Sequence, residues 1–127
     1  MTAWDTSLVI RNTLIILFFV TPLLYSCSRN VCDNKLREEV PSPNGEYVVS
    51  IIERNCGATT PFMSLVSIRR SDSSFDAEDY ENWVFTIEGK SNIAVSWEEN
   101  KKLKITYTGT GSTPNQKKTW NGIEIVS

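Results

Sequence analysis

Apolar residues recur with a period of two from residue 46 to the end of the chain, and this alternation limits the fold more than any other feature. Tyr47, Val49 and Ile51 share one face of an expected strand, and the residues between them are also largely apolar, which is typical of a central strand. Further strands are expected from Met63 to Arg69 and from alternating residues that begin at Trp83, Ile93, Leu103 and Trp120. No helical periodicity follows residue 40. The sequence therefore predicts an all-β fold, an antiparallel meander of about six strands that forms a blade-like sheet or a small sandwich.

Composition narrows the function classes. The chain of 127 residues fits one domain, and its formal net charge of -2 gives no electrostatic support for nucleic-acid binding. It contains no histidine, the commonest general base and the commonest metal ligand. We therefore expect no cofactor, no metal site and no nucleic-acid partner.

Residues 1–26 have the pattern of a targeting segment. An apolar run of roughly a dozen residues follows Arg11, the length of a signal-peptide core and shorter than the roughly 20 residues of a membrane span. Pro22 would interrupt a longer helix late in that run. We expect a signal or anchor helix here.

The run ends in Leu24-Tyr25-Ser26-Cys27, which resembles the bacterial lipobox. Leucine and the small residue before cysteine match, while Tyr25 is bulkier than the residue usual at its position. The resemblance implies that Cys27 becomes the lipidated first residue of the mature chain, anchored to a membrane and facing the periplasm or the exterior. Ser28 stands where an aspartate would hold a lipoprotein in the inner membrane, so outer-membrane sorting is implied for a Gram-negative source. An ordinary cleaved signal and an uncleaved anchor are the alternatives.

This interpretation divides the chain into a lipoprotein signal peptide (1–26), a tether (27–41) and a β domain (42–127). With lipid on Cys27, two cysteines are left, Cys32 and Cys56. Exported compartments are oxidising, so we expect these two to form a disulfide.

Several motifs resemble a family of small exported bacterial proteins of uncharacterised function. The family pattern is an early cysteine, Ser-Pro-Asp-Gly-Lys-Tyr, Asp-Cys-Gly-Ala-Thr-Thr and a late tryptophan hairpin. It is matched over most of the mature chain by Cys32, Ser42 to Tyr47, Cys56 to Thr60 and Trp97 to Leu103. Asn44 and Asn55 replace the usual aspartates. The resemblance implies no activity. Two of these segments are also similar to β-propeller blade repeats, but the chain is too short for the four blades that a propeller needs.

The stretch that begins at Cys56 invites two interpretations. A cysteine nucleophile would need an adjacent base, and no histidine exists to supply one, so half of a disulfide is the expected role. Gly57, Ala58, Thr59 and Thr60 would then form a tight bend, with the two threonine hydroxyls bonded to the loop backbone. This bend is also a possible binding loop.

An acidic segment between the expected strands offers a calcium site as an alternative to a solvated loop. Asp72, Ser74 and Asp76 fit alternating ligand positions, but Ala77 replaces the turn glycine of an EF-hand and Trp83 its terminal glutamate. A solvated loop is expected.

Aromatic residues alternate along the expected strands. A row of this kind is more often core than ligand site, although it can line a sugar or peptide groove. The residues concerned are Tyr47, Trp83, Trp97, Tyr107 and Trp120.

The sequence thus predicts a non-catalytic envelope lipoprotein with a structural or protein-interaction role. Its expected partners are the membrane, through lipid on Cys27, and an envelope protein. One alternative is an immunity protein or inhibitor that neutralises an envelope-acting toxin or enzyme. Another is a thiol enzyme or hydrolase that uses Cys56.

Overall fold

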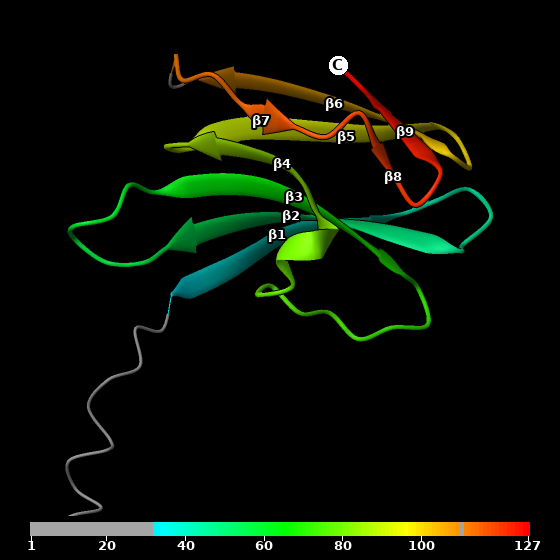
Figure 1. Cartoon of the computed structure of the whole chain (residues 1–127), viewed down its shortest axis with the longest axis horizontal. Helices are drawn as coiled ribbons and strands as arrows, with labels where there is room; N and C mark the ends of the chain where they lie inside the picture. The colour runs from blue at the N-terminus through cyan, green and yellow to red at the C-terminus, as the bar shows by residue number, and fades with distance from the viewer. Residues whose placement is uncertain (1–31, 110) are drawn as a thin grey trace, which may run out of the picture. The chain divides into compact units, whose positions relative to one another are not determined.

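Nine strands form in the part of the chain that the computed structural model describes, residues 32–109 and 111–127. Sheet A contains, in spatial order, β1 (Asp33–Pro41), β2 (Tyr47–Asn55), β3 (Met63–Arg70), β4 (Trp83–Glu88) and β7 (Asn115–Gln116). Sheet B contains β5 (Ser91–Glu99), β6 (Lys102–Gly109), β9 (Ile123–Val126) and β8 (Thr119–Trp120). One short 3-10 turn, η2 (Tyr80–Asn82), precedes β4 (Figure 1). The all-β prediction is confirmed, and two sheets are present rather than a single blade-like one.

The predicted signal segment and Cys27 lie outside the described residues. Within those residues, no helix is long and apolar enough to cross a membrane. The prediction of a lipid or helical anchor therefore stays a prediction.

The strand order departs from a simple meander in its second half. β1 to β4 pair antiparallel in succession, as do β5 and β6, but β6 then pairs in parallel with β9. Strand β7 was not predicted, because its two residues are too few to show a period of two. The predicted last strand is divided into β8, also of two residues, and β9. Asn121 and Gly122 both have positive φ, which is the backbone of a tight hairpin turn, and they join β8 to β9.

The expected tether is shorter than predicted, because residues 33–41 form strand β1. This strand pairs with β2 from Asp33 opposite Asn55 to Pro41 opposite Val48, with a bulge between Leu36 and Glu38. Its sequence, DNKLREEVP, is mostly charged or polar and shows no apolar alternation. An edge strand with much of its surface in water needs none, which is why the sequence pattern missed it.

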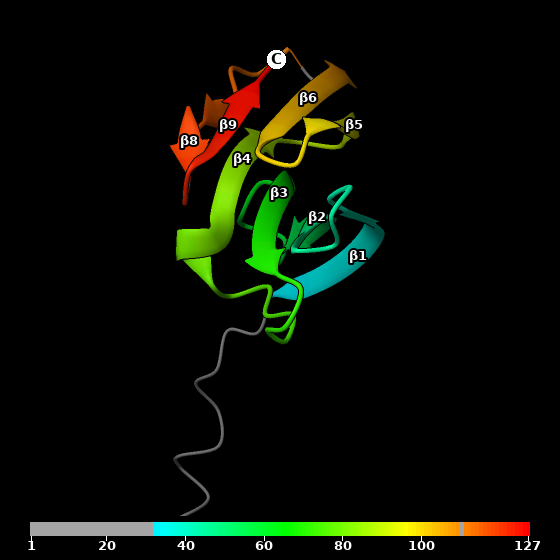
Figure 2. The same cartoon turned by 90° about the vertical axis from the view of Figure 1, so that its right-hand side faces the viewer.

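The core lies between the two sheets, which face each other in Figure 2. Its fully buried members include Val49, Val66 and Ile68 from sheet A and Leu103, Ile105 and Ile123 from sheet B. On the other face of sheet A, Ile52 and Leu65 are also 0% exposed, although neither belongs to this core. Figures 1 and 2 show the loop between β3 and η2 on that outer side. β2 is therefore central and buried on both faces, as predicted.

Replacing Ile105 by alanine tests the assignment of the core face on β6. The side chain is 0% exposed, so the change should lower the free energy of unfolding by about 2–5 kcal/mol in urea titrations. Thr106→Ala is the matched control, because its exposed side chain points to the opposite face and should change stability by about 0.5 kcal/mol or less. Equal losses in the two variants would contradict this assignment of the buried and exposed faces of β6.

Candidate functional site

A disulfide joins Cys32 to Cys56, as predicted. The two residues continue the β1–β2 register by one pair beyond Asp33 and Asn55, and their Cα atoms lie 4.1 Å apart. The bond therefore fastens the beginning of edge strand β1 to the end of central strand β2. Cys56 has no free thiol in this state, so it cannot act as a nucleophile.

The bend after Cys56 is closed by backbone groups. Gly57 has a φ of +113°, its N–H donates to Asn55 Oδ1, and the Thr60 N–H donates to the Gly57 carbonyl at 3.2 Å. The expected threonine bonds are wrong: within the described residues, the hydroxyls of Thr59 and Thr60 bond no backbone group. Both side chains are exposed, as are Gly57 and Ala58, so their hydroxyls are left to water. A binding role for this bend stays a prediction.

The side chain of Arg54, two residues before the disulfide, holds the acidic loop against sheet A. Its Nη1 and Nη2 atoms donate to Glu78 Oε1 and Oε2 at 2.7 and 3.0 Å, a bidentate ion pair. Nη1 also donates to Asn34 Oδ1 at 2.9 Å, and Nη2 to the Tyr80 hydroxyl at 3.3 Å. The Arg54 side chain is only 9% exposed. We call these four residues the Arg54 clamp.

Electrostatics keep the Arg54 clamp charged. Hydrogen bonds from Arg54, then from Tyr80 and Asn34, lower the pKa of Glu78 from 4.5 to about 2. Reciprocally, the hydrogen bond to Glu78 raises the pKa of Arg54. The ion pair thus persists over the whole neutral and mildly acidic range.

The acidic loop is consequently fastened to sheet A, whereas its composition predicted a solvated loop without such contacts. Besides Glu78, Asp76 accepts a hydrogen bond from the Glu78 N–H, and Asp79 accepts one from Asn82 Nδ2. Among the described residues, no three His, Cys, Asp or Glu side chains gather as a metal site. Sequence reasoning missed the clamp because Arg54 and Glu78 are far apart in the chain and neither lies in a motif.

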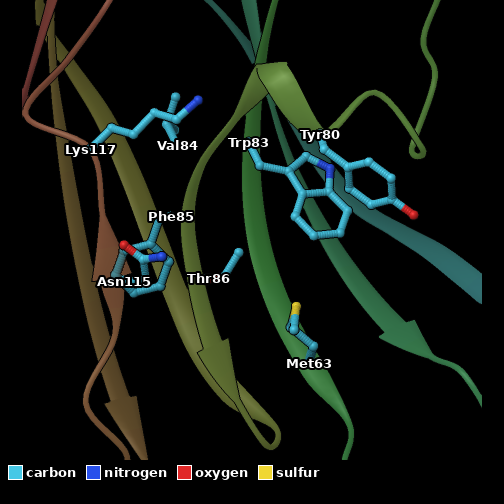
Figure 3. Close-up of a pocket in the computed structure, with 8 residues that line it drawn as sticks. All are labelled: Met63, Tyr80, Trp83, Val84, Phe85, Thr86, Asn115 and Lys117. Carbon is cyan, nitrogen blue, oxygen red and sulfur yellow. The ribbon is translucent and has the colours of Figure 1, made fainter. Parts of the chain in front are cut away.

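Beside the clamp, a groove runs along β4. One cavity of about 340 Å³ lies at the η2 end, and a second of about 440 Å³ shares Met63, Thr86 and Asn115 with it. The β4 groove is lined by Met63, Tyr80, Trp83, Val84, Phe85, Thr86, Ile87, Glu88, Ser112, Thr113, Asn115 and Lys117. In Figure 3, Tyr80 and Trp83 stand on one side of it and Asn115 and Lys117 on the other.

Trp83 is held in place at the end of this groove. Its Nε1 donates to the Ala77 carbonyl at 3.1 Å, and its ring meets that of Tyr80 edge-on with centroids 4.6 Å apart. The Arg54 guanidinium lies 5.4 Å from the centroid of its ring, a cation–π distance. The clamp therefore positions the aromatic wall of the groove as well as the loop.

Four of the five aromatic residues singled out in the sequence have one of the two expected roles. Tyr47 belongs to the core, and Trp97 and Trp120 pack against it. Trp83 lines the groove, and Tyr107 is 38% exposed. Strand alternation predicted the residues in the core. It could not predict that Trp83 lines a groove, because the Tyr80 ring beside it comes from η2 and not from a strand.

The groove offers both apolar and hydrogen-bonding groups. Tyr80 and Trp83 supply apolar surface at the η2 end, and Met63 supplies it where the two cavities meet. Thr86, Thr113 and Asn115 supply hydroxyl and amide groups. The Lys117 ammonium group donates a hydrogen bond to the Glu81 carbonyl at 2.9 Å. This bond ties η2 to the residue that directly follows β7. The cavity at the η2 end is mainly apolar, whereas the second cavity is mainly polar, so the groove could bind a ligand that has both kinds of surface.

Comparisons of the chain with protein-family models, with curated proteins and with solved structures found no significant match. The resemblance to exported proteins of uncharacterised function therefore stays a prediction. Function has to be argued from the residues described above.

Replacing both Cys32 and Cys56 by serine tests how much the disulfide contributes to the free energy of unfolding. Opening a loop with a sequence separation of 24 should cost about 3 kcal/mol of unfolding free energy in the chain-entropy model. Urea titration of the variant against the oxidised wild type measures the loss. Reducing the wild type should reproduce it, whereas an unchanged midpoint in both would show that β1 docks without the bond.

The Arg54 clamp should make stability depend on acid pH. Because the pKa of Glu78 is lower in the folded state than its ordinary 4.5, its contribution is complete above pH 4.5 and is lost as the pH falls towards 2. Glu78→Gln should remove that part of the pH dependence in urea titrations between pH 6 and 2. Glu81→Gln is the matched control, from a neighbouring carboxylate outside the clamp. A profile for Glu78→Gln that parallels the wild type would contradict the assignment.

Proposed function

We propose that this chain is an exported lipoprotein, anchored by lipid on Cys27, whose β domain has a non-catalytic, protein-binding role in the bacterial envelope. The single observation that carries the proposal is the Cys32–Cys56 disulfide. Structural disulfides form and persist in oxidising compartments and are rare in the reducing cytosol.

The disulfide also accounts for two of the three cysteines in the sequence. The third, Cys27, stands directly after the apolar run and in the position of the lipobox cysteine. An odd cysteine in an exported protein needs an explanation, and lipidation supplies one. This is the support for assigning the anchor to Cys27 rather than to a cleaved or retained signal helix.

The position of β1 restricts where the domain would work. Because β1 begins at Asp33, the segment between the lipid and the domain spans about 20 Å at most when fully extended. A domain on so short a connection stays next to the membrane surface. Its partner would therefore be another protein held at, or reaching, that surface.

The β4 groove supports binding as the role of the domain. Aromatic residues and methionine are enriched in protein interfaces, and the groove presents Met63, Trp83 and a Tyr80 side chain that is 57% exposed. The clamp fixes two of these side chains before any partner arrives, which lowers the entropy lost on binding.

Replacing Cys27 by alanine tests the anchor. The variant should lose both its incorporation of a labelled fatty acid and its recovery with washed membranes, while the domain still folds. Ser28→Ala is the matched control and should keep both properties, since it leaves the cysteine in place. If the Cys27→Ala chain stays lipid-labelled and membrane-bound, the proposal is wrong.

A further inference from the structure

The four edges of the two sheets are unequally protected against pairing with other strands. In the described part of the chain, sheet A ends at β1 and β7, and sheet B ends at β5 and β8. Edge strands expose unpaired backbone N–H and C=O groups, and proteins block them with charges, prolines, bulges or short length. An edge without these features is a site for adding a strand.

Three of these edges carry such features. β7 and β8 have two residues each. β1 has nine, but its sequence DNKLREEVP is rich in charge, contains a bulge between Leu36 and Glu38 and ends in Pro41. None of the three offers a long, flat backbone to a second chain.

β5 carries none of them over most of its length. The stretch Ser91–Trp97 (SNIAVSW) contains no charge and no proline, and the bulge of β5 comes only after Trp97. Its sole strand partner within the described residues is β6. Ile93, Val95 and Trp97 pack against the core but are only partly buried, so a further strand would cover apolar surface as well as backbone.

We propose that two copies of this chain associate through β5, which pairs antiparallel with itself about a two-fold axis at Ala94 and joins the two B sheets into one. This inference concerns a second copy and does not depend on the lipid anchor. A two-fold contact of this kind uses the same surface on both copies and closes after two.

The sequence of β5 favours this register. With Ala94 opposite itself, side chains keep their faces, and Ile93 of one copy meets Val95 of the other on the inner face. On the outer face, Asn92 of one copy meets Ser96 of the other, and Ser91 meets Trp97 at both ends of the inner face. At the centre of the pair, the exposed Ala94 of one copy lies opposite Ala94 of the other, and each presents only a methyl group.

Neighbouring registers are less favourable. Pairing about Val95 keeps only Ile93–Trp97 within the uncharged stretch and places Asn92 against Glu98, which lies in the bulge. Pairing about Ile93 keeps only Ser91–Val95 within the uncharged stretch, whereas pairing about Ala94 uses all of Ser91–Trp97. The longest uninterrupted pairing of this stretch with itself is thus centred on Ala94.

Ala94→Cys gives a direct test in the full chain purified in detergent. Directly opposite residues in an antiparallel pair have Cα atoms about 4.5–5.5 Å apart, within the range that a disulfide spans. The variant should form a dimer on a non-reducing gel that reduction returns to monomer. Ser96→Cys is the matched control: the two copies of residue 96 would lie about 13 Å apart along the strands, too far to bridge.

A second pair of variants tests the contact without cross-linking. Ala94→Lys places two ammonium groups opposite each other and should convert the dimer to monomer in sedimentation experiments. Thr106→Lys introduces the same charge beside it, on the inner strand β6, and should leave the dimer intact. A wild-type chain that stays monomeric at every concentration would overturn the proposal, as would cross-linking of Ser96→Cys as complete as that of Ala94→Cys.

Discussion

The burial of β2 on both faces is the constraint on which the rest of this structure depends. One face contributes Val49 and Ile51 to the core between the sheets, and the other carries Ile52, which is also completely buried. Such a strand needs cover on the outer side of sheet A as well as sheet B on the inner side. The loop before η2 lies on that outer side (Figure 1). The Arg54 clamp at the end of β2 fastens it.

The same strand connects the candidate site to the expected anchor. Arg54 positions Trp83 in the β4 groove, and Cys56, two residues later, bonds to the beginning of β1. The β4 groove and the beginning of β1 therefore both depend on one short segment, Arg54 to Cys56. Loss of the ion pair would free the loop and the aromatic wall together, whereas loss of the disulfide would free β1.

Residue alternation and turn signals predicted the all-β class and most of the longer strands, because burial on a sheet leaves a period of two in the sequence. They could not predict β1, whose charged residues suit an exposed edge, or the parallel pairing of β6 with β9, which joins strands distant in the chain. The disulfide was predictable from cysteine arithmetic. The β4 groove was not, because its residues come from β3, η2, β4 and the segment around β7, and only folding brings them together.

Mass spectrometry of unreduced peptides, from the protein recovered from the envelope, tests the proposed anchor and the disulfide together. We predict a chain that begins at Cys27 with added lipid mass, together with a peptide in which Cys32 is linked to Cys56. Free thiols at both Cys32 and Cys56, or an unmodified Cys27 inside a longer chain, would contradict the proposal of a disulfide-stapled lipoprotein.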